Sequence, residues 1–429
     1  MIAQLSQTAM GFVDTLMAAQ VSAEDLAAVA LGSSIWLPLL LSLGGILMAT
    51  TPLVAQLVGG SQEQRTPAIF QHGNLVALSI TLIAIALLRN CSPVLELMAI
   101  SGTLLIKTQQ YLDALSWGVP AILLYQVCRS YCEGFGKTRP IMKISVIALL
   151  CNIPLNYIFI YGKLGLPAYG GVGCGWASAI VMWIMAVAAV LYLHNAPQFK
   201  HYRLFSDWPR PSAKALLNFL TLGLPIGFTL LIEVSMFSVI ALLIARFGDT
   251  VIAAHQITLS FTGLIFMIPL SISLALTIRV GQLVGRQQFA AARFAASTGI
   301  LITCSCAVIT CGLILWLAEQ IAGLYTAQSD IVALASSLLM IAAIFQIPDA
   351  LQVSCAGALR GYKDASIPLL MVFTAYWLIG LPVGYTLGLT DLILPAQNAA
   401  GFWYSLVLGL SVGAILLASR LRIITRQCD

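Results

Sequence analysis

Apolar runs of about 20 residues recur from one end of this chain to the other, and they constrain its fold more than any other feature. At a rise of about 1.5 Å per residue, a helix of that length crosses about 30 Å of hydrocarbon. Only 9% of the 429 residues are charged, against about 25% in soluble domains. The sequence therefore predicts an all-α polytopic membrane protein, embedded in a lipid bilayer.

Polar and Gly/Pro-containing breaks divide the chain into twelve expected transmembrane helices. Their cores are 2–20, 27–58, 67–88, 109–132, 140–161, 172–193, 215–246, 250–280, 289–317, 331–359, 367–388 and 398–419. The first span is the most polar of them and begins almost at Met1. We expect that further residues precede it in the complete protein.

The Lys and Arg residues are distributed unevenly between the two sides of the membrane. Most of the 21 fall in the loops and the C-terminal tail on one side, and only Arg89, Lys107, Lys163 and Arg246 fall on the other. The side rich in positive charge is expected to be cytoplasmic, so both termini lie inside. The net charge of +5 is then a topology signal, and no nucleic-acid partner is expected.

The two halves of the chain resemble each other in sequence. Three matches occur in the same order and at nearly constant spacing: VAQLVG (54–59) with VGQLVG (280–285), EGFGKTRPIM (133–142) with RGYKDASIPLL (360–370), and PLNY (154–157) with PVGY (382–385). Six spans lie in each half, and because six is even both halves enter the membrane from the same side. The pattern predicts two parallel six-helix repeats, as in many secondary transporters.

The expected organisation is an N-terminal six-helix lobe at 1–194, a cytoplasmic linker at 195–214 and a C-terminal six-helix lobe at 215–429. One motif inside the repeats resembles a nucleotide site, because Gly136-Lys137-Thr138 matches the end of a phosphate-binding loop. Tyr131 occupies the position where such a loop needs its first glycine, and the repeat partner has no such motif. The chain is therefore not expected to hydrolyse ATP or to bind a cofactor.

Ionisable groups within apolar spans are costly, at about 2.5–3.5 kcal/mol each, and usually functional. Asp14, Glu233 and Asp349 are such groups, and Asn152 and Asn156 lie four residues apart on one helix face. Each half carries its own polar cluster, Asp14 with Asn152 and Asn156 in the first and Glu233 with Asp349 in the second. Two simpler interpretations remain open: asparagines often only hold membrane helices together, and a carboxylate could lie near the interface.

Either cluster could bind a coupling ion. A carboxyl group in surroundings of low polarity favours its protonated form, and carboxylate with amide oxygens could instead ligate Na⁺. Binding of the ion changes the charge of the site and therefore its affinity for a cationic substrate. This is the chemistry of an antiporter. Two further interpretations concern structure: Arg129 and Glu133, four apart, are expected to pair, and His255 could pack or contact a substrate.

The segment GFVDTLMAAQVSAEDLAAVALGSS, together with those around Glu233 and Pro348-Asp349, resembles the multidrug and toxic compound extrusion (MATE) family, in its NorM-like bacterial branch. The resemblance covers the whole chain. It implies a V-shaped, two-lobe, monomeric transporter of the bacterial inner membrane. Such a carrier exports amphipathic, mostly cationic drugs or dyes in exchange for Na⁺ or H⁺.

The resemblance also implies residue roles. Asp14 with Asn152 and Asn156 would form a cation site in the N-terminal lobe, and Glu233 with Asp349 one in the C-terminal lobe, so that Na⁺ could bind at either. Other carriers fit less well. The loop signature of a major facilitator is absent from VGGSQEQR, and a lipid-linked saccharide flippase would favour cationic cavity residues. A membrane-embedded enzyme would need motifs such as HExxH or GxGD, which the chain lacks, so no enzyme activity is expected.

Overall fold

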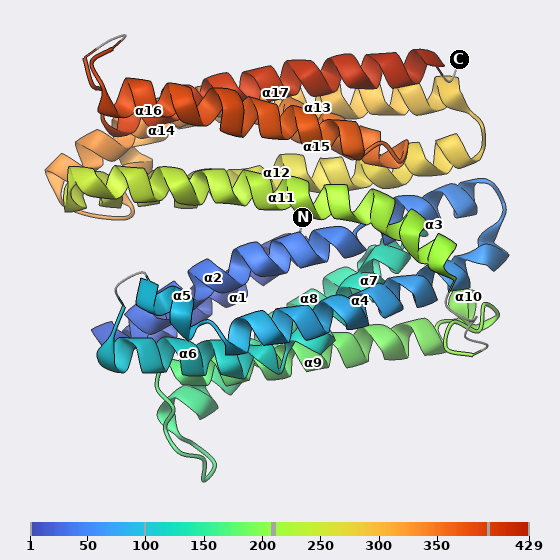
Figure 1. Cartoon of the computed structure of the whole chain (residues 1–429), viewed down its shortest axis with the longest axis horizontal. Helices are drawn as coiled ribbons and strands as arrows, with labels where there is room; N and C mark the ends of the chain where they lie inside the picture. The colour runs from blue at the N-terminus through green and yellow to red at the C-terminus, as the bar shows by residue number, and fades with distance from the viewer. Residues whose placement is uncertain (1, 98–99, 207–211, 393–394, 428–429) are drawn as a thin grey trace. The chain divides into compact units, whose positions relative to one another are not determined.

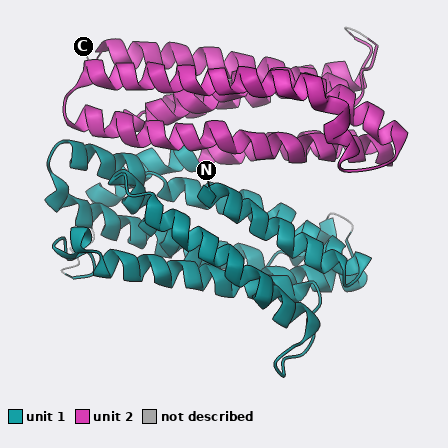
Figure 2. Cartoon of the chain, turned by 180° about the vertical axis from the view of Figure 1, so that it is seen from behind, with its two compact units in different colours: residues 1–227 teal, residues 228–429 magenta. Residues whose placement is uncertain are grey.

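The computed structural model describes residues 2–97, 100–206, 212–392 and 395–427. Within these residues the regular secondary structure is entirely helical. The chain forms two compact units, unit 1 with residues 1–227 and unit 2 with residues 228–429, coloured separately in Figure 2. The boundary between them falls inside one long helix, α11 (Ala213–Ile244). The lobe and linker limits expected from the sequence stay a prediction.

Unit 1 contains the helices α1 to α10, a 3₁₀ turn and the beginning of α11 (Figure 1). The elements are α1 (Ile2–Ala19), α2 (Ala23–Leu47), α3 (Thr50–Gly59), the 3₁₀ turn Glu63–Arg65, α4 (Thr66–Arg89), α5 (Ser92–Leu97), α6 (Gly102–Ser116), α7 (Val119–Gly134), α8 (Arg139–Tyr161) and α9 (Val172–Asn195). The short α10 (Pro197–Lys200) follows α9.

Unit 2 contains the remainder of α11 and fewer, longer helices than unit 1. Its elements are the 3₁₀ turn Ala245–Phe247, α12 (Asp249–Gly285), α13 (Phe289–Gly323), α14 (Ser329–Gly361), α15 (Ser366–Phe373), the π-helical segment Thr374–Gly380, α16 (Leu381–Leu389) and α17 (Ala399–Gln427). Among these, α14 packs against α12, α13 and α17, and so lies at the centre of the unit.

Proline accounts for two helix breaks that the sequence analysis did not predict. The expected span 27–58 is divided into α2 and α3, and the span 109–132 includes the junction of α6 and α7. Pro52 has no N–H to donate to the carbonyl of Met48, and Pro120 has none for that of Ser116. Each missing bond falls at the end of the preceding helix, where the break is observed.

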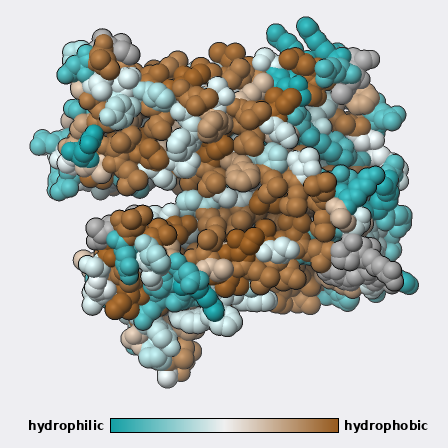
Figure 3. Space-filling model, viewed as in Figure 1, coloured by the Kyte–Doolittle hydropathy of each residue, from teal (hydrophilic) through white to brown (hydrophobic). Residues whose placement is uncertain are grey.

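Large apolar side chains cover the outside of the helices. Leu82 of α4 is 66% exposed and Trp316 of α13 is 76% exposed. On the face shown in Figure 3, apolar residues dominate the middle of the helices and hydrophilic residues gather toward their ends. This distribution is the one that a hydrocarbon layer selects, since apolar surface of this extent is not left exposed to water. The chain is a multi-pass membrane protein.

Among the described residues, 10 helical segments are long and apolar enough to cross a membrane. They correspond to ten of the twelve expected spans. The other two expected spans, 2–20 and 109–132, are also helical. Helix α1 is too polar to meet the same criterion, and α6 and α7 are each too short because of the break between them. The count of twelve spans is therefore not directly confirmed.

The internal repeat is visible in the backbone of the turns. Ser61 and Gln287 each lie two residues after the first matched pair of segments, and their φ angles are 56° and 59°. Gly136 and Lys363 are equivalent in the second pair, with φ of 72° and 62°. The left-handed conformation is uncommon for residues other than glycine, so its return at matching positions indicates that the two units share the same turn geometry.

The same segments also touch one another in the same way in both units. A Cβ atom added to Gly134 would lie 2.7 Å from Cβ of Val54, and one added to Gly361 would lie 2.9 Å from Cβ of Val280. Gly134 and Gly361 are equivalent in the repeat, as are Val54 and Val280. Each glycine therefore permits a close approach between two helices, and this contact explains why the matched segments stay similar.

The structure also explains the sequence Gly136-Lys137-Thr138. The N–H of Gly136 donates to the carbonyl of Glu133 at 2.7 Å, and that of Lys137 donates to the carbonyl of Cys132 at 2.9 Å. With the positive φ of Gly136, these bonds form the Schellman motif that ends α7. The motif is thus a helix terminus.

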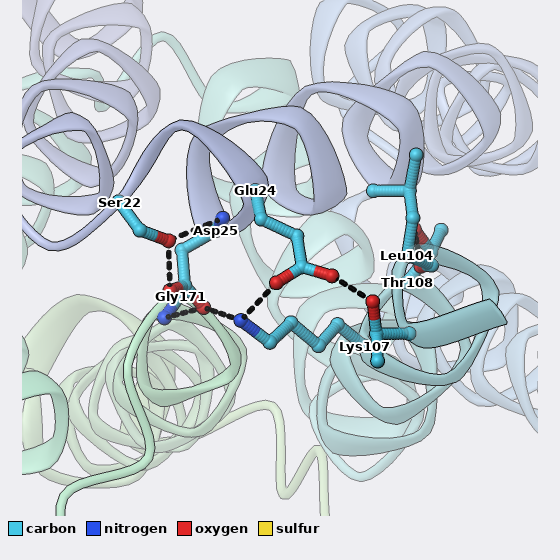
Figure 4. Close-up of polar contacts among 8 residues, drawn as sticks. Ser22, Glu24, Asp25, Leu104, Lys107, Thr108 and Gly171 are labelled. Carbon is cyan, nitrogen blue, oxygen red and sulfur yellow. Dashed lines mark hydrogen bonds and ion pairs between the residues drawn. The ribbon is translucent and has the colours of Figure 1, made fainter.

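A buried carboxylate joins three helices of unit 1. Figure 4 shows Asp25, in the first turn of α2, between Ser22, Lys107 of α6 and the backbone N–H of Gly171. Its side chain accepts hydrogen bonds from Ser22 Oγ at 2.5 Å and from Gly171 N at 3.0 Å, and Lys107 Nζ lies 3.2 Å from Oδ1. Gly171 directly precedes α9, so Asp25 fixes the beginning of that helix against α2.

Replacing this carboxylate should destabilise unit 1. Asp25→Ala leaves the N–H of Gly171 without its acceptor and removes the buried one of the two carboxylates that bind Lys107, and we expect the free energy of unfolding to fall by about 2–3 kcal/mol. Thermal unfolding of the detergent-solubilised protein measures the change. Glu24→Ala is the matched control, because Glu24 also binds Lys107 but its side chain is 40% exposed. Equal losses in the two variants would contradict the role given to Asp25.

Candidate functional site

Asp14, in the middle of α1, is the centre of a polar cluster inside unit 1. Its side chain is 7% exposed. Oδ1 accepts hydrogen bonds from Asn152 Nδ2 at 3.1 Å and from Asn156 Nδ2 at 2.6 Å. Oδ2 accepts a third from Ser178 Oγ at 2.8 Å. The structure therefore brings together the three residues that the sequence grouped in the first half.

The helices that supply these residues explain the geometry. Asn152 and Asn156 are four apart on α8, which packs against α1, so both amides face Asp14. Asn156 Nδ2 also lies 3.1 Å from Asn152 Oδ1. Both asparagines are fully buried. The hydrogen bond between Gly171 and Asp25 sets the start of α9, which carries Ser178 two turns further on.

The charge balance of this cluster is unusual. Within the described part of the chain, every side-chain donor to Asp14 is neutral, and no basic side chain forms an ion pair with it. In the same part of the chain, Asn156 Oδ1 is buried and has no hydrogen-bond partner. A carboxylate and an amide oxygen are ligands that hard cations prefer. The cluster can therefore take up a proton or a small cation without displacing an existing ion pair.

The second predicted pair lies in unit 2. Glu233 of α11 is partly exposed, and Asp349 of α14 is 8% exposed. Asp349 lies three residues before Gln352 on α14, and Gln352 reaches Glu233, so the two carboxyl groups belong to neighbouring positions of α11 and α14. Glu233 Oε1 lies 3.4 Å from Nε2 of Gln352, and the more distant Arg360 attracts its charge. The structure thus places Glu233 and Asp349 in one acidic cluster.

Other polar candidates have structural roles. Arg129 Nε donates to Glu133 Oε1 at 2.8 Å within α7, which confirms the predicted pair. His255 is 2% exposed, its Nδ1 accepts from Nε1 of Trp403 at 3.2 Å, and its ring packs against the indole. These contacts favour packing. The described residues contain no group of three or more His, Cys, Asp or Glu side chains that could hold a metal ion.

Comparison with known proteins identifies the fold and the family. The model of the family described as MatE matches residues 1–158 and 225–386, which lie in the two halves of the repeat. The chain belongs to the MatE family. This membership confirms the resemblance inferred from the acidic residues and the repeat, and it agrees with the expectation of a carrier that is not an enzyme.

Relatives of this MatE chain are similar over nearly its whole length. Multidrug resistance protein NorM of Photobacterium profundum is 46% identical over 429 residues, which are 100% of this chain and 94% of that protein. Multidrug resistance protein MdtK of Yersinia pseudotuberculosis is 45% identical over 427 residues, with 99% and 93% covered. These are bacterial proteins, which places the MatE chain among transporters of the inner membrane.

Solved MatE structures share the fold. The crystal structure of the eukaryotic MATE transporter AtDTX14 matches with a TM-score of 0.88 at 19% identity, over 100% of this chain and 95% of that one. The crystal structure of MATE in the bent conformation matches with a TM-score of 0.89 at 20% identity, over 100% and 93%. At these identities the likeness concerns the fold alone, and it confirms the all-α, two-repeat architecture expected from the sequence.

Two contacts of this MatE site were not predicted from the sequence. Ser178 Oγ binds Asp14 Oδ2, and Cys174 Sγ lies 3.4 Å from the backbone oxygen of Asp14. Both are on α9, whose glycine-rich start serves close packing, since a Cβ atom on Gly173 would lie 2.7 Å from the backbone of Phe159. The spacing of Cys174 and Ser178, one helical turn apart beside these glycines, was the available signal.

Removing the serine donor tests the geometry around Asp14. In Ser178→Ala, Oδ2 of a buried carboxyl group loses its hydrogen bond, and we expect the free energy of unfolding to decrease by about 1–3 kcal/mol. Thermal unfolding in detergent is the measurement. Ser79→Ala is the control, since Ser79 is exposed on α4 and bonds only within its own helix. If both variants unfold at the wild-type temperature, Ser178 does not stabilise Asp14.

Proposed function

We propose that this chain is an antiporter that exports amphipathic, mostly cationic compounds in exchange for Na⁺ or H⁺. The observation that carries the proposal is the state of Asp14, which is buried and bonded only to neutral donors in the described part of the chain. Its relatives NorM and MdtK are named multidrug resistance proteins at 46% and 45% identity. The export of several drugs is therefore the function that we assign to this chain.

The proposed mechanism uses the charge of the buried carboxylates. A cation that enters down its gradient gains about 2.3 kcal/mol per charge for each 100 mV of membrane potential. When it binds, it neutralises a carboxylate and weakens the attraction for a positively charged drug. When it leaves, the negative charge returns and the next drug molecule can bind. The ion and the drug thus alternate because the same negative groups attract both.

Two places could bind the coupling ion. In unit 1 the ligands would be Asp14 with the amide oxygens of Asn152 and Asn156, of which Asn156 Oδ1 is unbonded within the described residues. In unit 2 they would be Glu233 and Asp349, whose mutual repulsion a bound cation would relieve. A proton or a Na⁺ ion satisfies the electrostatic requirement at either place. No cofactor enters the proposal.

The fold alone does not determine the substrate. A MOP superfamily transporter from Pyrococcus furiosus, described as having a binding pocket of reverse polarity and a different function, matches this chain with a TM-score of 0.89 at 19% identity. Drug export therefore depends on the acidic character of the polar clusters. Asp14, Glu233 and Asp349 supply that character here, and a flippase for lipid-linked saccharides, which would favour cationic residues, is not favoured.

The distribution of Lys and Arg supports cytoplasmic N- and C-termini, and we propose that a single chain suffices for transport. The twelve spans expected from the sequence, six in each repeat, would already give a complete two-lobe carrier. Labelling of single cysteines introduced at the termini with a membrane-impermeant reagent, in intact cells and in everted vesicles, tests the orientation.

Efflux driven by defined gradients tests the proposed function. Everted vesicles that contain the wild type should accumulate ethidium when a Na⁺ or a proton gradient is imposed. We expect Asp14→Asn, Glu233→Gln and Asp349→Asn each to lower the gradient-driven rate at least about tenfold, because each removes a charge from a proposed site. Fluorescence of the dye gives the rate, and immunoblotting confirms equal amounts of protein.

Asp330→Asn is the matched control for this experiment. Asp330 lies in the first turn of α14 and is exposed, so its loss should leave efflux unchanged. The gradient that drives wild-type efflux identifies the coupling ion. If all three carboxylate variants retain gradient-driven efflux, the proposed roles are wrong.

A further inference from the structure

Gln352 connects Glu233 with a tyrosine on a neighbouring segment of unit 2. It lies on α14, three residues after Asp349, and is 3% exposed. Its Nε2 is 3.4 Å from Oε1 of Glu233 and 2.7 Å from the hydroxyl oxygen of Tyr376, which is also 3% exposed. Glu233, Gln352 and Tyr376 therefore form a row of polar groups inside unit 2.

Tyr376 belongs to an irregular part of the fold. It lies in the π-helical segment Thr374–Gly380, which separates α15 from α16. Such segments are rare and often occur at functional sites. A Cβ atom on Gly380 would lie 2.8 Å from the end of Met236, three residues after Glu233, so this segment approaches α11 closely. The π-helical segment therefore contacts α11, which carries Glu233, and also contacts Gln352, whose amide binds Glu233.

One end of the Gln352 amide is unsatisfied. Within the described residues, its Oε1 is buried and has no hydrogen-bond partner. A buried acceptor without a partner lowers the stability of the fold by about as much as the loss of one hydrogen bond. The space beside it exists because residue 413 is glycine, since a Cβ atom there would lie 2.6 Å from Oε1. Gln352 thus has an unused acceptor, and this end of the amide fits against Gly413 only because that residue has no side chain.

The chemistry of the amide gives this arrangement a use. An amide has a donor end and an acceptor end, and a hydroxyl group can donate or accept. In the structure, Nε2 donates to Oε1 of Glu233 and to the hydroxyl oxygen of Tyr376, an arrangement that suits a charged Glu233. When a cation occupies Glu233, a half-turn of the amide brings Oε1 toward that cation, and the hydroxyl of Tyr376 can then donate to Oε1.

We propose that Gln352 and Tyr376 are positioning residues that stabilise Glu233 both with and without its bound cation. This inference rests on the proposed function, in which Glu233 binds the coupling ion. The charged and titratable groups that act on Glu233 from the packed elements are Asp349 and Arg360 of α14 and Tyr376 itself. A test must therefore leave Asp349 and Arg360 unchanged.

The experiment measures how strongly the coupling cation drives transport. Proteoliposomes containing purified protein are loaded with ethidium, and the initial rate of dye transport is recorded over a series of proton and of Na⁺ concentrations. In Gln352→Leu, the cation concentration for half-maximal transport should change by about threefold or more. Tyr376→Phe, which removes a single oxygen, should change it in the same direction.

The double variant shows whether the two residues act together. Because Tyr376 acts through Gln352, Gln352→Leu/Tyr376→Phe should resemble Gln352→Leu alone, so the two effects should not be additive. Ser354→Ala and Tyr385→Phe are the controls. Ser354 is buried on the same helix and bonds to Ala350, and Tyr385 is an exposed tyrosine on α16. Both should keep the wild-type half-maximal concentration.

A second variant guards against misfolding of Gln352→Leu. Gly413→Ala leaves the polar groups in place and should shift the half-maximal concentration by pressing on the amide, whereas Gly312→Ala, which meets open space, should not. Size-exclusion chromatography confirms that each protein is folded. Unchanged half-maximal concentrations in Tyr376→Phe and Gly413→Ala, or additive effects in the double variant, would overturn the inference. If Glu233→Gln itself transports ethidium normally, the ion-binding role proposed for Glu233 fails instead.

Discussion

The interaction on which the rest of this structure depends is that of a buried carboxylate with neutral donors. Asp14 is held by two amides and a hydroxyl group, which stabilise its negative charge without cancelling it. Glu133 shows the contrast, because it pairs directly with Arg129 and has no need of another cation. A fixed ion pair would make Asp14 a structural residue. Because no such pair is present in the described part of the chain, Asp14 keeps the negative charge that the proposed function assigns to a coupling cation or a drug.

The two units share a scaffold and differ in chemistry. The left-handed turns and the Gly–Val contacts recur at equivalent positions, because they depend on the backbone and tolerate few side chains. The polar clusters do not recur: one unit places a carboxylate on its first helix with asparagines opposite, and the other places two carboxylates on α11 and α14. A duplicated fold can thus carry two different polar clusters.

Much of the fold was predictable, because long apolar runs separated by short polar or Gly/Pro-containing breaks are compatible with few structures other than a bundle of membrane helices. The helix breaks were not predictable from the prolines alone. Pro52 and Pro120 mark the ends of the helices that precede them, whereas Pro225, Pro269 and Pro348 lie inside continuous helices. The outcome depends on the neighbours that each proline meets. In the site, the spacing of Asn152 and Asn156 predicted a shared face, but Ser178 reaches Asp14 only through the close approach of α9. Such distances arise from tertiary packing, which no local pattern encodes.

The paired contacts of Gly134 with Val54 and of Gly361 with Val280 have an evolutionary consequence. After a gene duplicates, its copies drift apart, and positions where two helices pack too closely to admit a side chain tolerate little change. Those positions act as fixed points around which the remaining residues can be exchanged. Related proteins can therefore carry their charged residues in one half or in the other, and so differ in the ion or drug that they bind, while they retain the same backbone fold.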